Sequence, residues 1–272
     1  MKTETQTIMT IPAQTLSVRL AERVGYGNVG ASVWFIGMEE GFGSSAELPV
    51  RFAAPAVEDL RDALKKLRPF DPREYDDLGS GTKLQATWRR LMLAHLVAHE
   101  KPSGKQDLRE LQSSAAWGGL GGEVLLAELS PLLNHGLKSW EYSHFAGVGF
   151  RHLISRKDFN REALAKRVDF FAQLLHKNNP KVVVAYGLTP PYKSHFEKLL
   201  GDDGDQWKIV PNTTGSQYRY RSNYAIIPHP TSVGVSDNDY RHMGKWMGSV
   251  LKQSADACRD SRCGFGSTLG RR

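Results

Sequence analysis

The chain has 272 residues, of which 40% are apolar and 24% are charged. These proportions exclude a largely disordered or collagen-like protein. Lys and Arg outnumber Asp and Glu by 36 to 29, and the resulting net charge of +7 is compatible with a polyanionic partner such as nucleic acid. No uncharged apolar run approaches the roughly 20 residues of a membrane helix, and the polar N-terminal segment lacks the apolar core of a secretory signal. We therefore expect a cytoplasmic protein that does not enter a membrane.

The first half of the chain contains one short apolar run followed by helical patterns. The segment 25–30 has the glycine spacing of a dinucleotide-binding loop, but it precedes the apolar run 32–36 instead of following a strand, so we interpret it as a turn. The run 32–36 predicts a buried strand. Apolar residues at helical spacing then predict helices at 57–67 and 84–96, within an insertion of about 44–122.

Two groups of residues suggest metal ligands at first sight. His95 and His99 stand four residues apart on a predicted helix and could share a metal ion. The motif has no accompanying acid, and His95 lies on the apolar stripe, so we interpret His95 as a packed core residue. Cys258 and Cys263 have no further ligands nearby in the sequence and cannot complete a four-ligand site. We therefore expect no metal and no other cofactor.

The second half of the chain alternates strands and helices. Short apolar runs bounded by turn residues predict the strands, and apolar spacing of three and four residues predicts the helices. A small hairpin is expected before the last strand. In chain order, the predicted elements are a strand at 123–129, a helix at 164–175, a strand at 181–186, a helix at 192–200, a hairpin of 207–210 and 218–220, a strand at 224–228, and a helix at 237–251 capped by Ser236 or Asp237.

This order of elements predicts an α/β fold with three layers, α/β/α, around a central four-stranded parallel sheet. Strands that are apolar on both faces are typical of a parallel sheet covered by helices. We expect a single domain over 1–256, with the helical insertion inside it. From 257 to 272 the chain is rich in Arg, Ser and Gly, which indicates a basic, flexible tail.

Polar residues follow each predicted strand, and the carboxyl ends of parallel strands form the usual ligand-binding edge of such a sheet. The first strand is followed by acids and a glycine-aromatic loop, the second ends in an acid and leads to an Asn, the third closes on Gly, and the fourth runs into His-Pro-Thr-Ser. The candidate residues at this edge are Glu39, Glu40, Phe42, Glu128, Asn134, Gly187, His229, Thr231 and Ser232.

Taken together, these loops resemble the uracil-DNA glycosylase superfamily, in order and spacing over about 32–251. The resemblance implies that Glu39 or Glu40 positions a hydrolytic water and that His229 stabilises the leaving base. It also implies that the end of the second strand reads the base edge. The further residues it implicates are Phe42 and Gly187 at the base, and Thr231, Ser232 and Val233, which would grip the phosphates and wedge the duplex.

The sequence departs from the family pattern in two places. Glu40 is followed by Gly41 where the family usually has Pro beside the water-positioning residue, and Glu128 stands where many members have Asn, unless Asn134 is the reader. An amide offers both a donor and an acceptor, whereas an ionised carboxylate only accepts. A base that presents donors, such as an amino group, is therefore expected to suit Glu128.

The predicted hairpin alternates aromatic and cationic residues in Tyr218-Arg219-Tyr220-Arg221. This pattern suits stacking on bases and phosphate contacts by Arg219 and Arg221, although an ordinary edge hairpin has the same pattern.

The sequence thus favours a glycosylase-like protein that binds nucleic acid, DNA rather than RNA, and acts on a modified or mismatched base, as in base-excision repair. Whether it is an enzyme stays open. The alternatives are a non-catalytic binding module on the same fold and a hydrolase of free nucleosides. A row of Lys and Arg beside His229 would favour a nucleic acid as the ligand, and scattered Lys and Arg would favour a free nucleoside.

Overall fold

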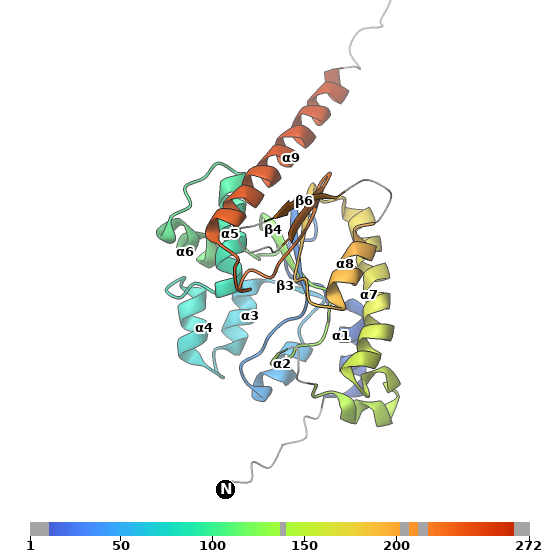
Figure 1. Cartoon of the computed structure of the whole chain (residues 1–272). Coiled ribbons are helices and arrows are strands. Elements are labelled where there is room, and N and C mark those ends of the chain that lie inside the picture. The colour runs from blue at the N-terminus through green and yellow to red at the C-terminus, as the bar shows by residue number, and fades with distance from the viewer. Residues whose placement is uncertain (1–10, 137–139, 202–206, 212–216, 264–272) are drawn as a thin grey trace, which may run out of the picture.

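The computed structural model describes residues 11–136, 140–201, 207–211 and 217–263 (Figure 1). Its strands form an eight-stranded mixed sheet in the order β3-β1-β4-β2-β5-β8-β7-β6. The strands are β1 (Gly25–Gly27), β2 (Val33–Gly37), β3 (Val57–Glu58), β4 (Val124–Glu128), β5 (Val182–Tyr186), β6 (Lys208–Pro211), β7 (Gln217–Arg221) and β8 (Tyr224–Ile227).

The α/β class is confirmed, but the predicted four-stranded parallel sheet is wrong in extent. The four predicted strands do pair in parallel, in the order β4-β2-β5-β8. Antiparallel pairing with β1 on one side and with the β6–β7 hairpin on the other makes the sheet mixed and wider. The segment expected as a turn at 25–30 contains β1. Its Gly-Tyr-Gly sequence and the two-residue β3 lack the apolar run that marks a strand.

Helices cover both faces of this sheet, as Figure 1 shows. They agree with the predicted helices in the main, except that the expected helix at 57–67 is divided between β3 and α3. The α-helices are α1 (Ala13–Glu22), α2 (Leu48–Phe52), α3 (Leu60–Leu67), α4 (Pro72–Gly79), α5 (Ala86–Ala98), α6 (Lys105–Ser113), α7 (Arg156–Asn178), α8 (Tyr192–Leu199) and α9 (Asp237–Cys263), with 3₁₀ turns η1 (Ser45–Glu47), η2 (Ser143–Val148) and η3 (Arg151–Leu153).

The last helix, α9, begins as predicted but ends later. Ser236 caps it, because its Oγ accepts from the Asp239 amide at 3.3 Å while the Asp239 carboxylate accepts from the Ser236 amide at 2.8 Å. The helix continues through Cys263, so the expected end at 251 is wrong, while the flexibility of the tail from 257 stays a prediction. No Gly or Pro interrupts the sequence between Leu251 and Cys263. The rest of the expected tail, 264–272, lies outside the described residues.

Two apolar clusters, one on each face, hold the layers together. Val33 and Phe35 of β2 belong to the cluster that includes α3, α4, α5, α6 and α9. Trp34 and Ile36 belong to the cluster with α1, α2, α7 and α8. All of these side chains are buried, which explains why the strand sequence is apolar without alternation. Within the described residues, no helix has the length and apolar character needed to cross a membrane. The cytoplasmic location stays a prediction.

The register of the parallel strands brings the predicted loops to one edge. Gly37 pairs with Glu128, and Tyr186 pairs with Ile227, so the ends of these strands lie level with one another. The loops after β2, β4, β5 and β8 therefore emerge side by side.

We expect Phe35→Ala to lower the free energy of unfolding by about 3–5 kcal/mol, because it removes a fully buried ring from the centre of the sheet. The Phe35 ring packs 5.8 Å from the Trp117 ring, centroid to centroid. Urea unfolding followed by far-UV circular dichroism measures the change. Ile154→Ala, at a side chain that is 60% exposed, is the control and should change stability by less than about 0.5 kcal/mol. Equal effects of the two variants would contradict the assigned core.

Candidate functional site

A cavity of about 870 Å³ opens at the carboxyl edge of the parallel strands. Its walls come from the loops after β2, β4, β5 and β8, and from α3, α4 and the start of α5 in the insertion. The volume is within the range of small-molecule sites. The sequence-predicted residues that line it are Glu39, Glu40, Phe42, Glu128, Asn134, His229, Thr231 and Ser232.

Glu39 is held through one of its two carboxylate oxygens. Its Oε2 accepts hydrogen bonds from Asn134 Nδ2 at 3.1 Å, from Arg156 Nη1 at 2.8 Å and from the Tyr192 hydroxyl at 2.9 Å. Within the described part of the chain, no group donates to its Oε1. A carboxylate that is oriented by one oxygen and free at the other can align a water molecule in the cavity.

Glu40 is held by a cluster of arginines. Its carboxylate lies 3.1 Å from both Arg19 and Arg51 and 3.9 Å from Arg23, and it also accepts from the Tyr26 hydroxyl. Burial alone would raise the pKa of Glu40, but the arginines together lower it below its ordinary value. With both oxygens occupied, Glu40 serves to anchor the loop. Of the two candidate acids, the geometry favours Glu39 for chemistry.

The loops after β2 and β4 continue the parallel ladder beyond the strands. The backbone N–H of Asn134 donates to the backbone carbonyl of Glu40 at 3.0 Å, and Gly41 and Asn134 form a parallel β-bridge. The side chain of Asn134 is buried, and its Oδ1 has no hydrogen-bond partner among the described residues. Asn134 therefore positions Glu39 through its side-chain Nδ2.

Glu128 is the second carboxyl group in the cavity, and its environment is opposite in character. The Tyr186 hydroxyl donates to its Oε1 at 3.1 Å, while Oε2 is buried and has no partner in the described chain. Burial and the nearby Glu40 carboxylate raise the pKa of Glu128 to about 8. Gly37 makes room for this pair, because a Cβ there would lie 2.2 Å from Glu128 Oε2. At neutral pH Glu128 is therefore mostly a neutral carboxylic acid.

The raised pKa disfavours the ionised form of Glu128, on which the expectation that it only accepts hydrogen bonds rests. A neutral carboxyl group offers one donor and one acceptor, as an amide does. The sequence-based argument for an amino-bearing base assumed an ionised side chain, and that base stays a prediction.

His229 follows β8 and faces the same cavity. The Thr231 amide donates to its Nδ1 at 3.3 Å, and the Thr231 hydroxyl lies 2.9 Å from the same atom. Burial lowers the pKa of His229, so the ring is neutral at pH 7. Because Nδ1 accepts from a backbone amide, the proton resides on Nε2. The ring can therefore donate a hydrogen bond from Nε2.

The remaining predicted contact residues differ in their surroundings. Phe42 packs on His135 with 3.9 Å between ring centroids, which leaves its other surface toward the cavity. Thr231 and Ser232 are exposed at the rim. Val233, next to them, is 99% exposed, which is unusual for a branched apolar side chain and agrees with a residue that projects from the rim.

Gly187 does not belong to the lining that the described residues form. Its φ of 116° requires glycine, and a Cβ there would lie 2.4 Å from the Met38 side chain. Gly187 thus serves the packing of the loop after β2, and the structure gives no support to the prediction that it binds a base.

Arg219 and Arg221 do not have the positions expected of phosphate ligands. Arg219 Nη1 bonds to Glu197 of α8 at 2.6 Å. Arg221 is buried, donates to the Leu200 carbonyl and stacks 5.0 Å from the Trp207 ring. The alternating aromatic and cationic pattern therefore reflects packing inside the protein, because both guanidinium groups bind partners of the same chain.

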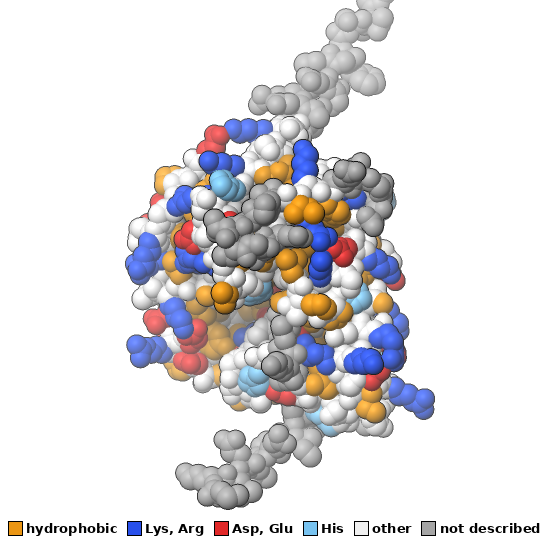
Figure 2. Space-filling view, in the orientation of Figure 1, with side chains coloured by type: hydrophobic (Ala, Val, Ile, Leu, Met, Phe, Trp, Pro, Cys, Tyr) orange, Lys and Arg blue, Asp and Glu red, His pale blue; other side chains and the backbone are white. Residues whose placement is uncertain are grey.

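The charge of the cavity wall is acidic. Among the described residues that line it, five are acidic residues, and the one Lys or Arg is Arg51, which binds Glu40 and Glu47. Outside the cavity, Arg89 and Arg90 lie near the His229 loop, but both pair with Asp237. On the face that Figure 2 shows, Lys and Arg side chains are spread out and interspersed with acids. The five acids are Glu39, Glu40, Asp71, Glu74 and Glu128.

Sequence reasoning missed three parts of the site. Tyr192 follows the loop after β5, so the same edge rule could have found it. Arg156, at the start of α7, follows no strand and had no sequence signal. The wall from α3, α4 and α5 was also missed, because the fold of the insertion was not predicted in detail.

No family model, curated protein or solved structure matches the chain. The chemistry of the cavity is the basis for a functional proposal.

Glu40→Gln should lower the free energy of unfolding by about 3–5 kcal/mol, because it leaves buried guanidinium groups without their anion. The difference from wild type should shrink as the pH falls below 4.5, the ordinary pKa of Glu, because the folded-state pKa is lower than the unfolded value and the stabilisation is lost on protonation. Chemical unfolding as a function of pH measures this. Glu162→Gln, in an exposed pair with Arg161, is the control and should have a much smaller effect. Similar effects of both variants would rule out the anchoring role of Glu40.

Glu128→Gln should change the pH dependence of stability in the opposite direction. Because the folded-state pKa of about 8 lies above the ordinary value of 4.5, wild type binds a proton in the folded state that the unfolded state has lost. As the pH rises from 4.5 to 8, the free energy of unfolding of wild type should fall relative to that of the variant, by at most about 1.4 kcal/mol per pH unit. Parallel profiles of the two proteins would show that Glu128 is ionised in the folded state.

Proposed function

We propose that the protein hydrolyses the N-glycosidic bond of a base held in this cavity, and that its fold belongs to the uracil-DNA glycosylase-like class. The observation that carries the proposal is the presence of three different groups in one cavity: the oriented carboxylate Glu39, the neutral acid Glu128 and the neutral His229. Together they supply what hydrolysis of such a bond requires. The order of these residues along the chain agrees with the family resemblance.

The reaction follows from these groups. Glu39 Oε1 aligns a water whose oxygen attacks the sugar carbon as its bond to the base breaks, and the negative charge of Glu39 offsets the charge of the oxocarbenium-like transition state. The bonding electrons leave with the base. His229 Nε2–H donates to the developing negative charge on that base. The water proton passes through Glu39 to solvent, and solvent protonates the released base.

Glu128 would select the base. A neutral carboxyl group that turns its unpartnered Oε2 toward the cavity would match an edge that presents a carbonyl beside an N–H, as in an oxo base. Tyr186 fixes the orientation of this group through its hydrogen bond to Oε1. We therefore assign the substrate base to the oxo class.

We further propose that the base is presented by a nucleic acid, DNA rather than RNA, from a single-stranded or flipped-out nucleotide. The exposed Thr231, Ser232 and Val233 support this, because they form a rim with hydroxyl groups and a projecting apolar residue. The phosphates would remain outside the acidic cavity.

A second candidate is a hydrolase of free nucleosides. The acidic wall favours it, because no cation that lines the cavity in the described residues is available for a phosphate.

The test is a base-release assay over modified-base oligonucleotides and the corresponding free nucleosides. We expect Glu39→Gln and His229→Ala each to lower turnover by roughly 100-fold to 10,000-fold while binding stays nearly intact, because their contacts form mainly in the transition state. Glu74→Gln, on the cavity wall, is the matched control and should keep its turnover. Glu128→Gln should retain oxo-base recognition and Glu128→Leu should lose it.

The alternatives predict different results. Release from nucleosides alone would establish the second candidate. Selective binding of one oligonucleotide without release of any base would show a non-catalytic binding module. Full activity in both Glu39→Gln and His229→Ala would disprove the residue assignment.

A further inference from the structure

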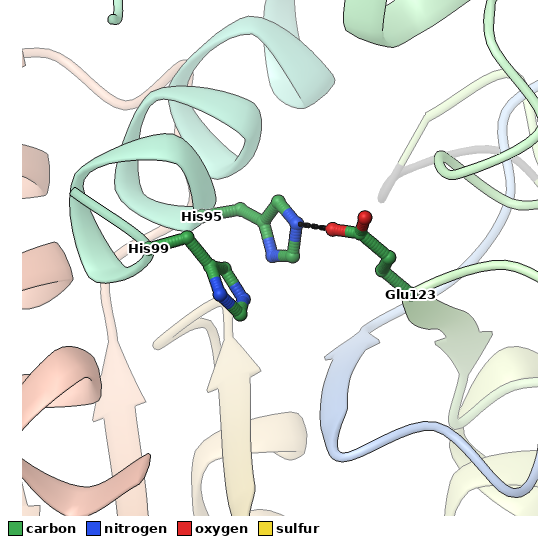
Figure 3. Close-up of side chains that lie close together, drawn as sticks. All are labelled: His95, His99 and Glu123. Carbon is green, nitrogen blue, oxygen red and sulfur yellow. Dashed lines mark hydrogen bonds and ion pairs between the residues drawn. The ribbon is translucent and has the colours of Figure 1, made fainter. Parts of the chain in front are cut away.

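His95, His99 and Glu123 come together at a second place in the fold (Figure 3). His95 lies in the last turn of α5, His99 caps that helix, and Glu123 precedes β4. The amino ends of the parallel strands are at this edge, whereas the cavity lies at their carboxyl ends. The first turn of α5 lines the cavity, and its last turn carries His95. The cluster is therefore separate from the proposed active site.

One ligand atom from each of the three residues lies within 4.8 Å of the other two. His95 Nε2 is 2.9 Å from Glu123 Oε2, and the two imidazole rings are 4.6 Å apart between centroids. A tetrahedral zinc ion with bonds of about 2.0–2.2 Å holds its ligand atoms about 3.4 Å apart, so the 2.9 Å pair must open slightly and the wider pairs must close. The side chains of His99 and Glu123 are on the solvent side and can make this small movement, while His95 is fully buried and fixed.

The ordinary explanation of this cluster is a hydrogen bond that satisfies a buried histidine. It accounts for His95 Nε2, but it leaves His95 Nδ1 buried without a partner among the described residues. It also gives no role to His99, whose ring faces the pair in Figure 3. Two imidazoles and a carboxylate on adjacent elements form a set of ligands that suits zinc better than calcium or magnesium.

The electrostatics of the cluster are compatible with a cation. The carboxyl group of Glu123 is exposed and brings an acidic ligand to the two imidazoles. Lys101 competes for the same carboxylate, since its Nζ is 3.4 Å from both oxygens. Lys101 is about half exposed and can move into solvent when another cation binds.

We propose that His95, His99 and Glu123 bind one zinc ion, with water in the fourth position. The ion would connect the end of α5 to the start of β4 and so join the insertion to the sheet. This site was not expected from the sequence, which interpreted His95 as a packed core residue.

The experiment is a titration of the untagged, full-length chain with Zn²⁺ by calorimetry, together with Co²⁺ substitution followed by visible absorption. We expect one equivalent of Zn²⁺ to bind and the melting temperature to rise. His99→Ala and Glu123→Gln should each weaken binding by more than about 100-fold, because direct ligands contribute more than their outer partners do. Lys101→Ala should strengthen binding, because it removes the competing ammonium group.

Two controls separate this site from other ligands of the chain. His176→Ala removes an exposed histidine of α7 and should leave binding unchanged. Cys258→Ser with Cys263→Ser should also leave it unchanged, and the Co²⁺ spectrum should lack a thiolate charge-transfer band. Binding that survives in His99→Ala, or that disappears with the cysteines, would overturn the proposal. The absence of saturable Zn²⁺ binding by wild type would do so as well.

Discussion

The buried Glu40 carboxylate and its arginines are the interaction on which the arrangement of the site depends. Arg19 comes from α1, Arg51 from α2, and Arg23 from the segment before β1, so one anion connects three separate parts of the chain. Arg19 also donates to the Pro131 carbonyl at 2.7 Å, which joins the loop after β4 to the same cluster. The cost of burying these charges is offset because each guanidinium finds an anion or a carbonyl. The loop that carries Glu39 is thereby fixed.

The same anion sets the protonation of its neighbour. Burial raises the pKa of Glu128, and the charge of Glu40 adds to this effect more than Arg23 offsets it. The site thus contains one carboxylate for structure, one available for water and one neutral acid. In the proposed reaction, different environments would divide three chemically identical groups among three tasks, a principle known from enzymes with paired carboxylates.

The insertion between β2 and β4 contributes to both edges of the sheet. The first turn of α5 forms part of the cavity wall, and its last turn carries the histidines of the proposed zinc site. A metal at that end would restrain the helix that also forms the wall. This geometry gives the insertion a structural reason to be rigid.

The sequence by itself determined the α/β class, the four central strands and the edge where the polar loops meet, because apolar runs and strand order act locally and through general topology. It also placed Glu39, Asn134 and His229 at this edge, where the structure has them lining one cavity. Only the tertiary structure decided which Glu is available, because that depends on arginines from distant elements. It placed Glu128 where burial raises its pKa, and it showed that Arg219 and Arg221 bind partners within the protein and that Glu123 lies beside His95. The edge strands β1 and β3 escaped prediction because pairing with β4 and with each other, and not their own residues, makes them strands.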